Sequence, residues 1–159
     1  MATVINIMRC TAIGEFGLPA WEDRSPVRPL WVAEELFAWA DNTMELHRTR
    51  IGGRSLFEHL EHMFCDFRCS PKINHADLKR MLPTRDGVWH MYPAGLRVYG
   101  WCPSPNSFVA VTAATAAATK TDPTLNDTKR DHVLRFARRH GLSSTIQTGD
   151  FLALFPNKN

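Results

Sequence analysis

Basic and aromatic residues that could act on a phosphate group gather in the second half of the chain. The run VWHMYPAGLRVYGW carries His90, Arg97 and Tyr99 on two predicted strands, and Lys120 follows the next strand. Arginine and lysine bind phosphate by Coulomb attraction and hydrogen bonds, and histidine and tyrosine can move protons. These residue types suit a metal-independent cleavage of RNA, in which the 2′-hydroxyl attacks the adjacent phosphate.

Neighbouring residues could hold the nucleic acid in place. Tyr92, Tyr99 and Trp101 could stack on unpaired bases, which favours RNA or a single strand over a duplex. The candidate catalytic residues are therefore Arg97, Lys120, His90 and Tyr99. The candidate RNA-binding residues are Lys79, Arg80, Arg85, Trp101, Arg135 and Arg138.

A structural role is the alternative for the same residues. The predicted strand Leu96–Trp101 alternates, so that Arg97, Tyr99 and Trp101 share one face. Such a face could simply be a solvent-exposed sheet surface that carries one arginine and a few aromatic side chains. The motif alone leaves both interpretations open.

Other chemistries find less support. His59, His62, Cys65 and Cys69 lie on one predicted helix, but their spacing matches no zinc motif, so we expect no metal and no cofactor. No GxSxG elbow is present, and Gly52-Gly53 is not part of a phosphate-binding loop. Carboxylate pairs of the kind that glycosidases use are hard to find in the second half.

Charge is distributed unevenly along the chain. Residues 1–66 hold ten acids and six bases, a net charge of −4, and residues 67–159 hold six acids and thirteen bases, a net charge of +7. The total of +3 therefore hides a basic second half. Such asymmetry suggests a surface that faces a polyanion, with chance segregation of surface charges as the alternative.

The composition is that of an ordinary globular protein. The chain has 159 residues, of which 44% are hydrophobic and 22% charged. No apolar run approaches the ~20 residues that span a bilayer, and the N-terminus does not read as a signal peptide. We therefore expect a cytoplasmic location with no membrane contact, and four cysteines that remain reduced thiols.

Three consecutive strands are expected to position the candidate residues. They are Val88–Tyr92, Leu96–Trp101 and Phe108–Ala114, joined by proline-containing turns. Two helices flank them. Ser55–Phe67 begins with a capping box formed by Ser55 and Glu58, and the basic helix Thr128–His140 ends at Gly141.

The remaining segments give weaker patterns. We expect a strand at Thr3–Thr11, a helix at Leu30–Asn42, a helical turn at Asn74–Met81 and a final hydrophobic strand within Ile146–Phe155. Thr43–Ile51 is ambiguous and could include a short edge strand.

The run ADLKRMLPTRDGVWHMYPAGLRVYGW resembles the central signature of the RelE/HigB-like toxins of bacterial toxin–antitoxin systems. In that family a helix ending in Leu-Lys leads into a strand reading roughly G-x-W-E-x-R, then a strand reading roughly Y-R-V. A third strand ends in a basic segment. The matching segments here are Leu78-Lys79, Gly87–His90, Leu96–Tyr99 and Thr119-Lys120.

This resemblance implies metal-independent cleavage of free or ribosome-bound mRNA, and a cognate antitoxin protein as partner. Arg97 matches the strand arginine that contacts the reacting phosphate, and Lys120 matches the basic residue that closes the third strand. Lys79 and Arg80 lie where the family has substrate-binding bases.

Two features depart from the family pattern. His90 stands where glutamate is commoner, and only His132 and His140 are candidates for the usual C-terminal tyrosine or histidine. The alternative is a non-catalytic interaction protein of a phage or mobile element, which binds a host protein or nucleic acid through its basic face.

The expected fold class is α+β. We expect a single domain over residues 1–159, with a small, mostly antiparallel sheet and helices packed on one face of it. A RelE-like core would occupy about residues 50–142, and residues 1–49 would form an N-terminal extension.

Overall fold

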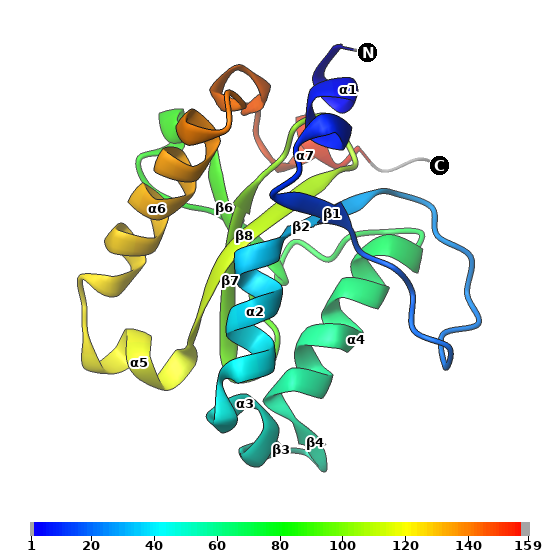
Figure 1. Cartoon of the computed structure of the whole chain (residues 1–159), viewed down its shortest axis with the longest axis vertical. Coiled ribbons are helices and arrows are strands. Elements are labelled where there is room, and N and C mark those ends of the chain that lie inside the picture. The colour runs from blue at the N-terminus through cyan, green and yellow to red at the C-terminus, as the bar shows by residue number, and fades with distance from the viewer. Residues whose placement is uncertain (1, 157–159) are drawn as a thin grey trace.

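A six-stranded mixed sheet organises the chain. The computed structural model describes residues 2–156, with side chains from residue 6 onward, and the strand order is β1-β2-β8-β7-β6-β5 (Figure 1). Only β2 and β8 pair in parallel, and every other neighbouring pair is antiparallel. The strands are β1 (Ile13–Glu15), β2 (Leu30–Ala33), β5 (Leu78–Arg80), β6 (Val88–Met91), β7 (Leu96–Trp101) and β8 (Phe108–Thr115).

Besides the six-stranded sheet, the described residues form seven α-helices and a small β-hairpin. The hairpin pairs β3 (Arg50–Ile51) with β4 (Arg54–Ser55). The α+β class is thereby confirmed. The helices are α1 (Ala2–Arg9), α2 (Glu34–Asn42), α3 (Met44–Arg48), α4 (Leu56–Cys69), α5 (Ala116–Thr121), α6 (Leu125–Arg139) and α7 (Phe151–Leu154). Among residues 2–156, no helix is long and apolar enough to cross a membrane.

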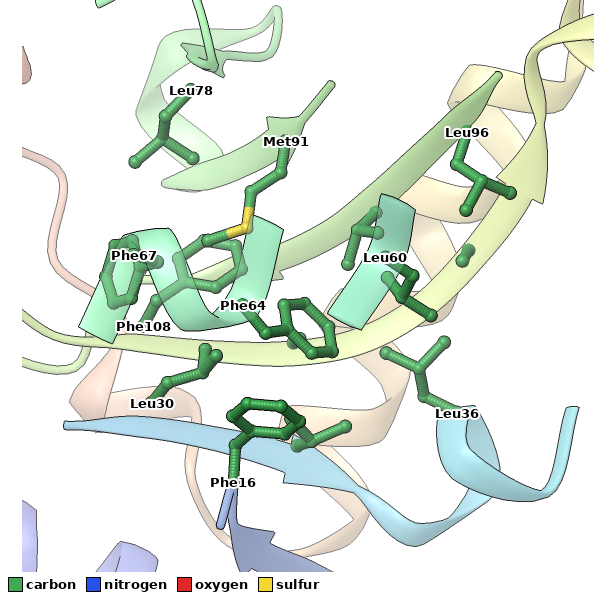
Figure 2. Packing of buried hydrophobic residues seen from close by; sticks show 14 of the residues in the cluster. Phe16, Leu30, Leu36, Leu60, Phe64, Phe67, Leu78, Met91, Leu96 and Phe108 are labelled. Carbon is green, nitrogen blue, oxygen red and sulfur yellow. The ribbon is translucent and has the colours of Figure 1, made fainter. Parts of the chain in front are cut away.

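Helices cover both faces of the sheet, so the expectation that they pack on one face is wrong. In β8, Phe108 and Ala110 belong to the hydrophobic cluster that includes α4, as Figure 2 shows for Phe108 beside Phe64 and Phe67. Val109 and Val111 belong to the opposite cluster, which includes α6. Every residue of β8 is buried, as expected of a strand that is covered on both faces.

The three central strands are the ones that the sequence predicts. The predicted strand Leu96–Trp101 coincides with β7, and the other two differ from β6 and β8 by one residue at one end. A register shift separates Tyr99 from Gly100. At Gly100 a β-carbon would lie 1.8 Å from the carbonyl oxygen of Val109, so only glycine fits this close approach of β7 to β8.

The predicted N-cap of α4 at Ser55 is confirmed. The Ser55 hydroxyl accepts a hydrogen bond of 3.1 Å from the backbone N–H of Glu58. The helix continues two residues past its predicted end to Cys69. There Arg28, which is buried, donates to the carbonyl oxygens of Phe67 (2.5 Å) and Ser70 (2.7 Å) and so satisfies the open end of the helix.

Three predictions for the first half of the chain are wrong. Thr3–Thr11 is mostly the helix α1, and Asn74–Met81 leads into the strand β5 instead of forming a helical turn. The predicted helix Leu30–Asn42 begins only at Glu34, because Leu30–Ala33 pairs with β1 and β8 as β2. Tertiary pairing overrides the helical spacing of its apolar residues there.

The chain after β8 also differs from the prediction. Ala116–Thr121 forms the helix α5, which carries Lys120, and α6 begins three residues earlier than predicted, at Leu125. The hydrophobic tail forms α7 instead of a strand. Phe151 and Phe155 of this tail pack against Trp89 of β6, which buries the apolar segment without strand pairing.

Candidate nucleic-acid site

One row of side chains crosses the sheet where the candidate residues lie. The register pairs Lys79 of β5 with His90 of β6, His90 with Tyr99 of β7, and Tyr99 with Thr112 of β8. Residues paired in this way place their side chains on the same face. At the β8 end, Lys129 of α6 donates to the Thr112 hydroxyl at 3.3 Å. At the β5 end, Lys79 is exposed to solvent.

Tyr92, which follows β6, brings two cations together. The guanidinium carbon of Arg97 lies 4.3 Å from the centroid of the Tyr92 ring, and the ammonium nitrogen of Lys79 lies 5.0 Å from it. The Tyr92 hydroxyl lies 2.7 Å from Nε2 of His90. We call Lys79, His90, Tyr92 and Arg97 the cationic cluster.

The charge of the cationic cluster is not neutralised within the described residues. Among residues 2–156, no Asp or Glu oxygen lies within 4.0 Å of a side-chain nitrogen of Lys79 or Arg97. By contrast, Arg68 and Arg130 both form ion pairs. Two adjacent cations without a carboxylate partner are a natural binding site for an anion such as phosphate.

His90 is neutral at physiological pH. Its pKa is lowered from 6.5 to about 4, mainly by burial and in addition by the nearby charges of Arg97 and Lys79. Its Nδ1 is buried and has no hydrogen-bond partner among the described residues. A neutral imidazole can accept a proton in a reaction but cannot serve as the imidazolium acid.

Tyr99 and Trp101 share the face of Arg97, as predicted, but both are fully buried. The Tyr99 hydroxyl donates to Oδ1 of Asn126 at 2.5 Å, and burial raises its pKa to about 12. Trp101 donates from Nε1 to the Thr145 hydroxyl at 3.0 Å and packs beside Phe136. In this conformation Trp101 therefore cannot stack on a base, and Tyr99 cannot exchange a proton directly with RNA.

Arg97 also lines a pocket that contains Lys120. This Arg97–Lys120 pocket has a volume of ≈ 460 Å³ and lies among α3, the β3–β4 hairpin and α5. It joins two of the four candidate catalytic residues, although Lys120 lies on a helix and not at the end of a strand. The lining residues are Glu45, Thr49, Ile51, Leu56, Gly95, Arg97, Thr115, Ala116, Ala117 and Lys120.

The other candidate RNA-binding residues lie apart from the cationic cluster. Arg80 is paired with Trp89, whose side chain belongs to the α4 face, and it donates to the carbonyl oxygens of Thr148 and Gly149. Arg85 lies exposed in a 3-10 turn, Thr84–Asp86. Arg138 is exposed on α6.

Arg135 belongs to a second surface hollow. It lines this hollow with Arg139, His132 and Glu35, and Nε2 of His132 lies 2.6 Å from Oε1 of Glu35. Glu35 belongs to α2, whereas the cationic cluster lies on β5 to β7. The structure thus separates Arg135 from the residues that surround Tyr92.

The histidines and cysteines of α4 have structural contacts. The His62 ring stacks on Trp21 at 4.3 Å, and Nε2 of His59 lies 2.7 Å from the carbonyl oxygen of Ile51. Cys65 is buried, and burial raises the pKa of its thiol to about 12. Within the described ranges, no group of three or more His, Cys, Asp or Glu residues is placed to hold a metal ion.

Tyr92 is the residue whose role the sequence reading did not identify. The sequence predicts only base stacking for it, yet its ring and hydroxyl connect Arg97, Lys79 and His90. The available signal was the alternation of Val88, His90 and Tyr92 on one face, extended one residue beyond the strand. The sequence could not show that Arg97 of the neighbouring strand reaches back to that ring.

No protein-family model, curated protein or solved structure matches this chain. Evidence for the function therefore comes from the chemistry of the cationic cluster and the Arg97–Lys120 pocket.

Proposed function

We propose that the protein is an RNA-directed, metal-independent endoribonuclease, similar in kind to the RelE/HigB-like toxins. One observation carries this proposal. Arg97 and Lys79 contact the same tyrosine ring without a carboxylate partner, and the hydroxyl of that ring bonds a neutral histidine. A phosphate site thus lies directly beside a pair of groups that can transfer a proton.

Each residue of the cationic cluster has a role in the proposed reaction. Arg97 stabilises the charge that develops on the attacked phosphate, and Lys79 holds the RNA backbone. The Tyr92 phenol, whose pKa is raised mainly by burial, stays protonated at neutral pH. It accepts the proton of the attacking 2′-hydroxyl as it donates its own proton to His90.

The departing 5′-oxygen requires a proton donor. The ammonium groups of Lys120 and Lys79 are the candidates, because both are exposed near Arg97 or Tyr92. The products would be a 2′,3′-cyclic phosphate and a free 5′-hydroxyl. Tyr92 thereby takes the proton-transfer role that the sequence predicts for Tyr99, and no metal ion takes part.

The order of elements supports the resemblance to the toxin family. A helix (α4) precedes three antiparallel strands (β6, β7 and β8), Arg97 lies on the middle strand, and Lys120 follows the third. One feature differs from the family pattern, because Leu78-Lys79 lies on a strand here and not at the end of a helix. Under this proposal the protein acts in the cytoplasm on mRNA, free or ribosome-bound, and a cognate antitoxin protein restrains it.

The second candidate is a non-catalytic protein that binds nucleic acid through the cationic cluster. The low pKa of His90, about 4, favours it, because such an imidazole is a weak base at neutral pH. The cations would then hold RNA without cleaving it.

Induced expression separates the two candidates. Wild type is compared with Arg97→Ala and with Arg9→Ala, a matched control at an exposed arginine of α1 outside the cluster. Growth arrest with mRNA cleavage in the wild type and in Arg9→Ala, but not in Arg97→Ala, is the expected result. Absence of cleavage together with RNA retained in a pull-down would overturn the enzyme and support the binder.

A further inference from the structure

We infer that the Arg97–Lys120 pocket is a nucleobase subsite that selects guanine in single-stranded RNA. This inference rests on the proposed function and names the base that lies beside the bound phosphate. Arg97 provides the connection, because its guanidinium contacts Tyr92 in the cationic cluster and also lines the pocket. A phosphate held by Arg97 therefore directs the adjoining nucleoside into the pocket.

The floor of the pocket is apolar and suits the flat face of a base. Ile51 of the β3–β4 hairpin is 43% exposed, which is high for a large aliphatic side chain, and Leu56 lies beside it. Gly95 closes the floor with φ +74°, where a β-carbon would lie 2.5 Å from Cδ2 of Leu56. Only glycine lets the β6–β7 turn approach these side chains so closely.

The rim of the pocket supplies charge of both signs. Lys120 and Arg97 can bind phosphate oxygens, and the volume of ≈ 460 Å³ lies within the range of about 300 to 1,000 Å³ that small-ligand sites occupy. Glu45 is exposed, and among the described residues no Lys, Arg or His nitrogen lies within 4.0 Å of its carboxylate. Its oxygens are free to accept hydrogen bonds from a ligand.

The chemistry of Glu45 points to guanine. The Watson–Crick edge of guanine presents N1–H and the 2-amino group side by side, so that one carboxylate can accept from both. Uracil presents a single N3–H flanked by two carbonyl oxygens. A carboxylate repels these oxygens because both groups carry negative charge. A hydrogen bond to a charged group contributes about 1.5 to 3 kcal/mol, which corresponds to at least a tenfold difference in Kd.

Titration of the 159-residue chain with GMP, UMP and inorganic phosphate tests this inference. We expect GMP to bind about tenfold more tightly than UMP. Glu45→Gln should bring the two values of Kd within about twofold of each other, because an amide offers both a donor and an acceptor and suits either base. Glu34→Gln, at an exposed acid of α2 that does not line the pocket, should keep the preference. Arg97→Gln should weaken both nucleotides alike.

Equal affinity for GMP and UMP, or a preference that survives Glu45→Gln in a folded variant, would overturn the inference. Failure of the proposed function gives a different result. If GMP selection depends on Glu45 but RNA is not cleaved, the base subsite stands and the ribonuclease falls. If RNA is cleaved in an Arg97-dependent manner but GMP and UMP bind equally, the ribonuclease stands and the base subsite falls.

Discussion

The guanidinium carbon of Arg97 lies 4.3 Å from the centroid of the Tyr92 ring. This contact orients the arginine by cation–π attraction and leaves its charge intact. A carboxylate would orient the guanidinium as well, but it would neutralise the charge that a phosphate needs. Arg97 is thus held in place by a neutral ring and by a hydrogen bond of 2.6 Å to the carbonyl oxygen of Leu96.

Tyr92→Phe and Tyr92→Leu should separate the two roles of this tyrosine. Phenylalanine keeps the ring beneath Arg97 but loses the hydroxyl, so cleavage should fall while RNA affinity stays within about twofold of wild type. Leucine removes the ring as well, and the loss of a cation–π contact of about 1 kcal/mol should weaken RNA binding about fivefold. Fluorescence anisotropy with a labelled RNA decamer measures the affinities. Equal affinity losses in the two variants would contradict the assignment.

His90 should make folding stability depend on pH. Because its pKa is about 4 in the folded chain and 6.5 ordinarily, the folded state binds fewer protons between these values. The contribution of His90 is therefore full above pH 6.5 and is lost as the pH falls toward 4. Between pH 7.5 and pH 5 the loss should be about 2 kcal/mol.

Urea denaturation at the two pH values measures this loss. His90→Gln should lower the pH dependence of the unfolding free energy by about 2 kcal/mol, whereas His75→Gln, at an exposed histidine, should leave it in place. The same pH dependence in His90→Gln as in wild type would show that His90 titrates normally.

Trp101→Phe should affect the core and not RNA binding. The substitution removes the hydrogen bond to Thr145 and part of a fully buried ring, and it should lower the unfolding free energy by about 2 kcal/mol. RNA affinity should remain at the wild-type value under conditions in which the variant is folded. A folded variant of unchanged stability that binds RNA weakly would show instead that Trp101 stacks on a base.

The dependence of RNA affinity on salt should report the number of cations that meet the backbone. Contacts from Lys79, Arg97 and Lys120 predict a slope of log K against log salt of about −2 for a single strand. Arg97→Gln should make this slope shallower by about 0.7, and Arg9→Gln should not change it. A slope near zero for the wild type would contradict binding through the basic residues.

The sequence predicted the central strands and the best-capped helix, because their signals are local. The prolines and Gly95 delimit β6 and β7, and Ser55 with Glu58 fixes the start of α4. Leu30–Ala33 could not be identified in this way. Its strand conformation depends on pairing with Phe108 and its neighbours in β8, which lie nearly eighty residues further along the chain.

Part of the candidate site could also be predicted from local sequence signals. His90 and Arg97 come together because β6 and β7 are neighbours, and both strands were predicted from the sequence. Lys79 joins them through β5, a strand that the sequence predicted as a helical turn. The burial of Trp101 beneath α6 could not be predicted from the sequence. Alternation shows which face of a strand a residue occupies, but it does not show whether a helix covers that face. For the same reason, the sequence did not show that helices cover both faces of the sheet.

The most direct test of the account is single-turnover cleavage of a defined RNA decamer by purified protein in the presence of EDTA. We expect the wild type and Arg9→Gln to cleave the RNA and leave a 2′,3′-cyclic phosphate. Arg97→Gln should be slower by at least about a hundredfold, the size of effect typical of losing one transition-state hydrogen-bond donor. A decamer with 2′-deoxyribose at the cleaved position should resist the wild type. Equal rates for wild type and Arg97→Gln, or cleavage of the deoxy substrate, would contradict the claim that Arg97 and the attacking 2′-hydroxyl carry the reaction.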